Sequence, residues 1–164
     1  MKKAAVIMGS DSDLPVVEKT INTLVQLGVP TQVHVYSAHR TPDEARQFAL
    51  AAEENGFGVI IAAAGMAAHL AGALAAVTVL PVIGIPLSSS VLDGMDALLS
   101  TAMMPPGVPV ACVGINGAVN AAILAAQILA SDDPGLMERL RAYKAAAAEK
   151  VRAKNAAIEE KYNS

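Results

Sequence analysis

Cysteine, aromatic residues and charged residues are all scarce in this sequence. Cys112 is the single cysteine among 164 residues, so no disulfide can form within the chain, and a reducing compartment, the cytoplasm, is expected. Aromatic residues make up 3% and charged residues 16%, against 54% hydrophobic residues. A surface this poor in charge needs to be covered, which favours an oligomer. The formal net charge of −3 argues against a general nucleic-acid-binding protein, which would present a basic face.

Residues 55–92 contain no Asp, Glu, Lys or Arg, so a membrane span has to be considered. Pro81, Pro86 and His69 interrupt this stretch, and its many alanines are only weakly apolar, so membrane insertion is not expected. The apolar run near the N-terminus is too short for a signal peptide. The sequence therefore predicts a cytoplasmic protein without a membrane partner.

Short apolar runs alternate with longer helical patterns over most of the chain. The strand candidates are residues 4–9, 31–36, 57–63, 80–86 and 108–115, and the helical stretches lie near residues 14–27, 42–55, 66–79, 93–103 and 117–131. Continuous apolar strands separated by helices are typical of a parallel sheet covered on both faces. The predicted fold class is therefore α/β, a three-layer αβα arrangement around a doubly wound parallel sheet of five strands.

The tail from residue 133 to residue 162 has a different pattern. Apolar residues recur there at helical spacing between charged ones, namely Leu136, Leu140, Tyr143, Ala147, Val151, Ile158 and Tyr162. The predicted amphipathic helix could cover its own sheet or extend partly to a neighbouring subunit, and the second arrangement is favoured. No repeat or composition break marks a second domain. Residues 1–164 are expected to form a single domain, with an α/β core over 1–131 and a C-terminal helix over 132–164.

The segment SAHRTPDEA, residues 37–45, follows the second strand candidate and opens a helix. Thr41 is the predicted N-cap, and Glu44 three residues later completes a predicted capping box. His39 and Arg40 then lie in the loop at the carboxyl end of the strand. In open parallel sheets that edge is where ligands bind. The position of the two side chains therefore makes them candidates for a functional site.

The segment MGSDSDLP follows the first strand candidate and opens the first helix. Ser10 and Ser12 offer hydroxyl groups beside backbone N–H groups at a helix start, which suits an anion. The letters exclude a P-loop and a dinucleotide fingerprint, and simple helix capping by Asp13 or its neighbours is the alternative. Exposed His39 and Arg40, taken alone, would likewise be only solvated. A functional role is favoured because both loops bring anion-binding or proton-transferring groups to one sheet edge.

The segment AAAGMAAHLAG, residues 62–72, leaves the third strand candidate. Glycine and alanine build walls from backbone rather than side chain, which suits a small, dry pocket. His69 either lines this pocket or is a satisfied inner residue of a helix packed through its alanines. His34 lies inside a strand pattern, and Cys112 lies in an apolar run without a polar activating neighbour. We interpret the last two residues as structural.

These three segments resemble the phosphoribosylaminoimidazole carboxylase catalytic subunit family, more narrowly its bacterial 5-(carboxyamino)imidazole ribonucleotide mutase branch. SAHRTP and AAHL are the most specific motifs, and LPVIGIP, LDGMDALLS, MPPGVPVACVGING and AVNAAILAAQILA follow in order. The resemblance covers nearly all of the chain to about residue 131. The family motif AGGAAHLPG differs here at Met66 and Ala71, which replace a glycine and a proline, and TAMMPPG stands where IVQMPGG is usual.

The resemblance implies a flavodoxin-like subunit, a homo-octamer with sites between subunits, and a step of de novo purine synthesis. Family members move a carboxylate from the exocyclic nitrogen of an aminoimidazole ribonucleotide to carbon 4 of the ring. They use no metal and no organic cofactor. The implied partners are therefore the ribonucleotide substrate and further copies of the chain.

The resemblance also implies roles for individual residues. His39 is the proton-transfer residue. The remaining residues bind substrate: the phosphate by Ser10, Ser12, Ser37 and Arg40, the ribose hydroxyls by Asp13, and the migrating carboxyl group by Gly65, Ala67 and His69.

Three other interpretations stay open. The animal-type branch of the family, which adds free carbon dioxide to aminoimidazole ribonucleotide, typically has SAHK where this chain has Arg40. Asp11 and Asp13 form a DxD pattern like that of haloacid-dehalogenase-like phosphatases, although Gly9 and Ser10 separate it from the strand. A non-catalytic nucleotide-binding module would leave His39 without a purpose. The mutase is the favoured interpretation.

Overall fold

The sheet of this protein is parallel throughout, as the computed structural model shows for residues 1–163. Its five strands lie in the order β2-β1-β3-β4-β5. They are β1 (Lys3–Met8), β2 (Thr31–Val35), β3 (Phe57–Gly65), β4 (Val82–Leu87) and β5 (Ala111–Cys112). Along the chain, β2 is added on one side of β1, and β3, β4 and β5 are then added in order on its other side. This order confirms the predicted doubly wound α/β fold.

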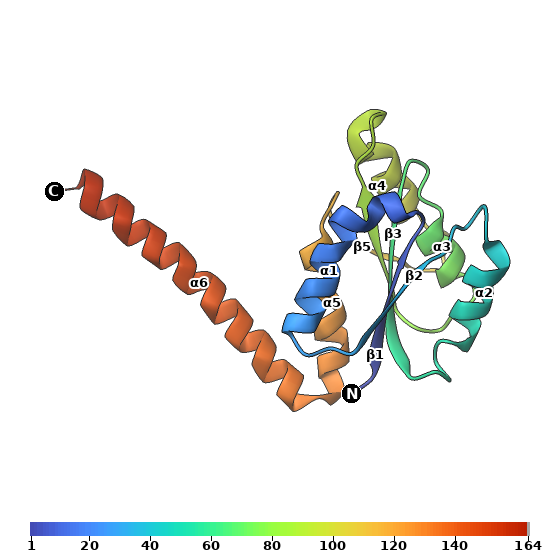
Figure 1. Ribbon diagram of the computed structural model, residues 1–164, viewed down its shortest axis with the longest axis horizontal. Coiled ribbons are helices and arrows are strands. Elements are labelled where there is room, and N and C mark those ends of the chain that lie inside the picture. The colour runs from blue at the N-terminus through green and yellow to red at the C-terminus, as the bar shows by residue number, and fades with distance from the viewer. Residues whose placement is uncertain (164) are drawn as a thin grey trace.

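Helices cover both faces of the sheet (Figure 1). The helices are α1 (Leu14–Gln26), α2 (Pro42–Ala51), α3 (Leu70–Ala75), α4 (Met95–Ala102), α5 (Ala118–Leu129) and α6 (Pro134–Tyr162), with short 3-10 turns η1 (Asp11–Asp13), η2 (Leu92–Gly94) and η3 (Ala130–Asp132). One face packs against α1 and α5 and the other against α2 and α3. Because side chains alternate along a strand, Val6 of β1 joins the first core and Ile7 the second.

Small residues let the helices approach the sheet closely. The buried face of α5 is all alanine but for one leucine: Ala118, Ala121, Ala122, Ala125, Ala126 and Leu129. On the opposite face, a Cβ atom added at Gly84 of β4 would collide with the methyl group of Thr101 on α4. The excess of alanine and glycine therefore serves tight packing between layers.

Two predicted elements are shorter than the sequence indicates. The helix predicted over 66–79 begins only at Leu70, because Met66 adopts a left-handed backbone with φ of 54° and the next residues form a loop. The strand predicted over 108–115 shrinks to Ala111 and Cys112, and Asn116 then turns the chain with φ of 55°. In both places a left-handed residue after the strand turns the chain within the loop.

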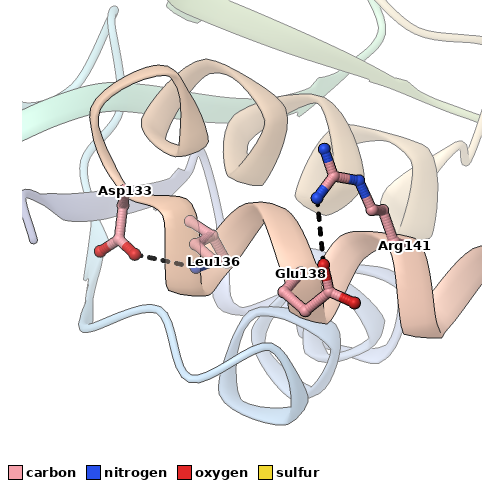
Figure 2. Close-up of polar contacts among 4 residues, drawn as sticks. All are labelled: Asp133, Leu136, Glu138 and Arg141. Carbon is pink, nitrogen blue, oxygen red and sulfur yellow. Dashed lines mark hydrogen bonds and ion pairs between the residues drawn. The ribbon is translucent and has the colours of Figure 1, made fainter.

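The C-terminal helix α6 projects away from the sheet (Figure 1). The Asp133 carboxylate accepts a 2.8 Å hydrogen bond from the Leu136 backbone and so caps the helix (Figure 2). Leu136 and Leu140 are buried in the first turns, whereas Val151 is 66% exposed and the residues after it are also exposed. The alternative in which this helix covers its own sheet is therefore wrong for its second half.

Ion pairs add little to α6. Glu138 and Arg141 form a 3.0 Å pair (Figure 2), with side chains that are 71% and 69% exposed. A pair this exposed stabilises a helix by at most about 0.5 kcal/mol. Among the helices of residues 1–163, none combines the length and the apolar character needed to cross a membrane.

Candidate active site

The loops that leave β1, β2 and β3 meet in one cleft of about 710 Å³ at the carboxyl edge of the sheet. All the residues that the sequence singles out for the site line this cleft: Ser10, Ser12, Asp13, Ser37, His39, Arg40, Gly65, Ala67 and His69. Two further residues line the cleft that were not predicted from the sequence, Ser88 and Ser89 in the loop after β4. The run of serines directly after an apolar strand is the signal that would have found them.

The loop after β1 folds back on itself through its own side chains. Ser10 is the N-cap of the 3-10 turn, and its hydroxyl accepts hydrogen bonds from the Ser12 backbone at 3.3 Å and the Ser12 hydroxyl at 2.9 Å. The Asp13 carboxylate accepts a 3.1 Å bond from the Ser10 backbone and completes a capping box. Two hydroxyl groups and one carboxylate are thus held together at the start of α1.

Asp13 lines the cleft with a carboxylate whose ionisation is perturbed. Its burial raises the pKa above the ordinary value, and the nearby charge of Asp11 adds to the rise. The hydrogen bonds from the Ser10 and Gly9 backbone oppose this effect. A half-buried carboxylate in this position suits a partner that donates hydrogen bonds, such as a pair of sugar hydroxyls.

The loop after β2 is closed by Thr41, although not in the predicted way. Thr41 is the N-cap of α2, but its hydroxyl makes no capping bond, so the predicted capping box with Glu44 is wrong. The hydroxyl instead accepts a 2.8 Å bond from the Ser37 backbone N–H. The Ser37 hydroxyl in turn accepts bonds from the backbones of His39 and Arg40 at 3.4 and 3.2 Å. These local bonds compete successfully with helix capping and fix the loop that presents both side chains.

Arg40 joins the first two loops. Its Nη2 donates a 3.2 Å bond to the carbonyl oxygen of Gly9, which directly follows β1. A guanidinium has five N–H donors, so most of them stay available to an anion beside Ser10 and Ser12. The arrangement is suited to a phosphate group.

The imidazoles of His39 and His69 touch. Nε2 of His39 lies 2.8 Å from Nδ1 of His69, with the rings at 84° to one another. At this distance one nitrogen carries the shared hydrogen and the other accepts it, so the rings fix each other's tautomer. His69 is exposed and lies in the cleft, so the alternative of a satisfied inner histidine is wrong.

The loop after β3 offers backbone and small side chains. Gly65 ends the strand in register with Leu87 of β4, and Met66 then turns the chain. The backbone N–H of Ala68 donates a 2.8 Å bond to the Ser100 hydroxyl, which itself donates to the Asp96 carbonyl oxygen at 2.7 Å. The wall of the cleft is therefore held from behind by α4.

His34 and Cys112 lie outside the cleft. His34 stacks on Tyr36 with ring centroids 5.1 Å apart, and burial lowers its pKa. Cys112 is half-buried, and burial raises the pKa of its thiol, which makes it a poor nucleophile. Within residues 1–163 no group of three or more His, Cys, Asp or Glu side chains is placed to hold a metal ion.

The fold and the cleft define an α/β protein of flavodoxin-like topology with a cleft at the carboxyl edge of its sheet, the edge where such folds bind ligands. Residues 3–150 match the family model described as AIR carboxylase. The chain therefore belongs to the AIR carboxylase family.

Relatives that match most of the chain carry two names, mutase and carboxylase. The N5-carboxyaminoimidazole ribonucleotide mutase of Pyrococcus abyssi is 53% identical over 144 residues, 88% of this chain and 83% of that protein. The mutase of Thermotoga maritima is 50% identical over 144 residues, 88% of this chain and 84% of the other. The phosphoribosylaminoimidazole carboxylase of Ogataea methanolica is 55% identical over 129 residues, which are 79% of this chain but 24% of that longer protein.

The fold has close counterparts among solved structures. The crystal structure of Treponema denticola PurE matches with a TM-score of 0.84 at 26% identity, over 95% of this chain and 98% of the other. The similarity extends over both chains almost completely, so the layers and the strand order are those of this family.

Proposed function

We propose that the chain is an N5-carboxyaminoimidazole ribonucleotide mutase, an isomerase of purine biosynthesis. It moves the carboxylate of its substrate from the exocyclic nitrogen to carbon 4 of the imidazole ring. The observation that carries the proposal is the meeting of His39 with the phosphate-suited group of Arg40, Ser10 and Ser12 in one cleft. Relatives of that name, about half identical over most of the chain, support it.

The nucleotide is held by the polar side of the cleft. Arg40, Ser37 and the hydroxyls of Ser10 and Ser12 bind the phosphate, and Asp13 accepts hydrogen bonds from the ribose. None of these groups takes part in bond changes. Their task is to fix the imidazole ring against His39, which converts binding energy into correct orientation.

His39 acts as general acid and then as general base. It gives a proton to the carbamate nitrogen as the N–C bond breaks, which yields aminoimidazole ribonucleotide and carbon dioxide. Carbon 4 of the ring then attacks the carbon dioxide, and His39 takes the proton that carbon 4 loses. The proton balance of the enzyme is restored at the end of each turnover. His69, 2.8 Å away, holds the His39 ring in a fixed orientation.

Carbon dioxide has to be retained between the two steps. The wall formed by Gly65, Ala67 and His69 provides a small site for it next to the ring. A retained carbon dioxide makes the second bond formation almost intramolecular, and effective molarities of such reactions are high. This wall is accordingly the part of the cleft that separates a mutase from an enzyme that releases its intermediate.

A direct carboxylase is the second candidate, because carboxylases are also among the relatives. Arg40 in SAHR favours the mutase over the SAHK branch. The purified enzyme should convert N5-carboxyaminoimidazole ribonucleotide to the 4-carboxy isomer in the absence of ATP. Efficient carboxylation of aminoimidazole ribonucleotide by bicarbonate, without turnover of the carbamate, would instead establish the carboxylase.

The chain is proposed to assemble as a homo-octamer in the cytoplasm. Large apolar side chains are exposed around η2 and α4, namely Val91, Leu92, Met95, Leu99 and Met103, and again on the second half of α6. Such surfaces call for a protein cover. Light scattering should give about eight times the 16.8 kDa of one chain, and a monomer at micromolar concentration would refute the assembly.

A further inference from the structure

The loop after β4 places Ser88 beside the wall of the proposed carboxyl site. Leu87 is the ladder partner of Gly65, so Ser88 is the next residue beyond the paired ends of β3 and β4. Ser88 lines the same cleft as His39 and His69. A hydroxyl group is therefore available beside a wall that otherwise offers backbone, alanine and the His69 imidazole.

Asn116 controls the orientation of this hydroxyl. The Ser88 backbone N–H can only donate, and it donates to Oδ1 of Asn116 at 3.0 Å, which fixes the orientation of the amide. The Asn116 Nδ2 then donates to the Ser88 hydroxyl oxygen at 2.8 Å. Since an amide NH₂ has only hydrogens to give, Ser88 accepts in this contact and its own hydrogen stays free.

The same contact is supported from the backbone. Asn116 adopts a left-handed conformation with φ of 55°, and its N–H donates a 2.9 Å bond to the Pro86 carbonyl oxygen. On the other side, a Cβ atom at Gly94 would lie 3.0 Å from the Ser88 Cα. Ser88 is thus confined between η2 and the start of α5.

The neighbouring serine, Ser89, differs from Ser88 in the hydrogen bonding of its hydroxyl group. The Ser89 hydroxyl donates a 2.9 Å bond to the Val91 carbonyl oxygen, so its hydrogen is already used. Of the two serines that the loop after β4 contributes to the cleft, Ser88 is the one with a hydrogen to give.

We propose that Ser88 donates a hydrogen bond to an oxygen of the migrating carboxyl group, and that Asn116 is the positioning residue that aims it. The proposal rests on the proposed mutase function. Negative charge grows on the oxygens of carbon dioxide as the bond to carbon 4 forms. A donor already oriented toward that charge stabilises the transition state and keeps the carbon dioxide in place.

The test compares mutase turnover with release of the intermediate. Ser88→Ala should lower formation of the 4-carboxy product about tenfold to a hundredfold, as loss of a hydrogen bond to a charged group does. A larger share of turnovers should release aminoimidazole ribonucleotide. Affinity for aminoimidazole ribonucleotide itself, which lacks the carboxyl group, should stay within about twofold of the wild type. Ser90→Ala, in the same loop but outside the cleft lining, is the matched control and should behave as wild type.

The role of Asn116 has its own test. Asn116→Asp keeps the acceptor for the Ser88 backbone but replaces the donor with a second acceptor, which draws the Ser88 hydrogen away from the cleft. It should reproduce the product loss of Ser88→Ala, and adding it to Ser88→Ala should lower the rate little further. A full additional loss in the double variant would overturn the positioning role.

The outcomes separate this inference from the proposed function. Absence of mutase activity in the wild type would refute the function itself. If the wild type turns over normally and Ser88→Ala releases no larger share of aminoimidazole ribonucleotide than the wild type, only the role of Ser88 is refuted. A loss of affinity for aminoimidazole ribonucleotide equal to the loss of rate would make Ser88 a general structural residue and would also overturn the inference.

Discussion

The two sides of the cleft are lined by different kinds of residue. The loops after β1 and β2 carry hydroxyl groups, a carboxylate, a guanidinium and an imidazole, held by hydrogen bonds within each loop and by the bond from Arg40 to Gly9 between them. The loop after β3 carries glycine and alanine and is tied to α4 from behind by Ser100. The first side has many groups to offer to a phosphorylated ligand, and the second leaves space.

This difference matches the two demands of a carboxylate transfer. A ribonucleotide has charge and hydroxyl groups to be recognised, whereas carbon dioxide has almost none and has only to be confined. His39 belongs to the polar side, but its ring touches His69 of the other side at 2.8 Å. The contact between the imidazoles is the point where the two sides of the cleft meet.

Replacing His39, the proposed proton carrier, is the strongest test of the difference between the two sides of the cleft. His39→Asn should lower turnover by at least about a hundredfold, because general acid–base catalysis typically contributes that much or more. Nucleotide affinity should stay close to the wild-type value, because the phosphate is bound elsewhere. Calorimetry with aminoimidazole ribonucleotide and a turnover assay measure the two effects.

His34→Gln is the matched control for that experiment. This histidine lies outside the cleft, against Tyr36 and Phe48, so its loss should reduce stability but leave turnover per folded molecule unchanged. If His39→Asn instead lost binding and kept single-turnover chemistry, the assignment of His39 as the proton carrier would be wrong.

Removing the phosphate anchor should have the opposite signature. Arg40→Ala is expected to raise the KM about tenfold to a hundredfold, since hydrogen bonds to a charged group contribute roughly 1.5–3 kcal/mol. The kcat should fall less. Arg46→Ala removes a charge from the exposed side of α2 and should change neither constant. An unchanged affinity in Arg40→Ala would contradict the proposed phosphate site.

Most of the difference between the two sides of the cleft could be predicted from the sequence. The order of apolar runs gives the parallel sheet, and the place of SAHR and MGSDSD after strands puts both at one edge. The contact of His39 with His69 could not be predicted, because it depends on how far the third loop bends. That bend comes from the left-handed Met66 and from a bond to Ser100, 32 residues further along the chain than Ala68.

Hydroxyl groups explain the other errors. Thr41 is the N-cap of α2 as predicted, but its hydroxyl bonds the Ser37 backbone and does not close the predicted capping box with Glu44. Ser88 could not be singled out from the sequence, because its hydroxyl is oriented by Asn116, which is distant in sequence. The turn that brings Asn116 to Ser88 is not revealed by strand patterns. A short polar side chain has several partners within reach, and tertiary contacts decide among them.

The half-buried carboxylate of Asp13, on the polar side of the cleft, should lower the stability of the protein although it favours binding. Burial raises the pKa of Asp13, so the folded protein takes up its proton at higher pH than the unfolded chain. Stability therefore falls as the pH rises through the interval between the two pKa values, and the cost is fully present at neutral pH. Asp13→Asn should raise the Tm at neutral pH and weaken nucleotide binding.

The pH dependence sharpens this prediction. The gain in Tm of Asp13→Asn over the wild type should shrink as the pH is lowered through the raised pKa of Asp13, because the wild-type carboxyl group then also becomes neutral. Thermal melts of the two proteins over a pH series measure it. A gain that grows on acidification would show that the carboxylate stabilises the turn.

The smallest expected effect concerns the other side of the cleft, at the position where the family motif has glycine. Met66 has φ of 54°, and its side chain is 64% exposed, so it gains little from burial. A left-handed residue other than glycine costs about 1–2 kcal/mol, and the extra freedom of glycine in the unfolded chain returns about 0.5–1 kcal/mol of this. Met66→Gly should therefore stabilise the protein by about 0.5 kcal/mol, a rise in Tm of about 1–2 °C.

Ala67→Gly separates backbone strain from a general effect of glycine. Ala67 is not among the residues with positive φ, so the same substitution one position later should lower the Tm by a similar amount. Calorimetric melts of both variants decide the matter. Should both substitutions lower the Tm equally, the Met66 side chain must be covered in the assembled protein, and this wall of the cleft would then be shaped by a neighbouring subunit rather than by its own backbone.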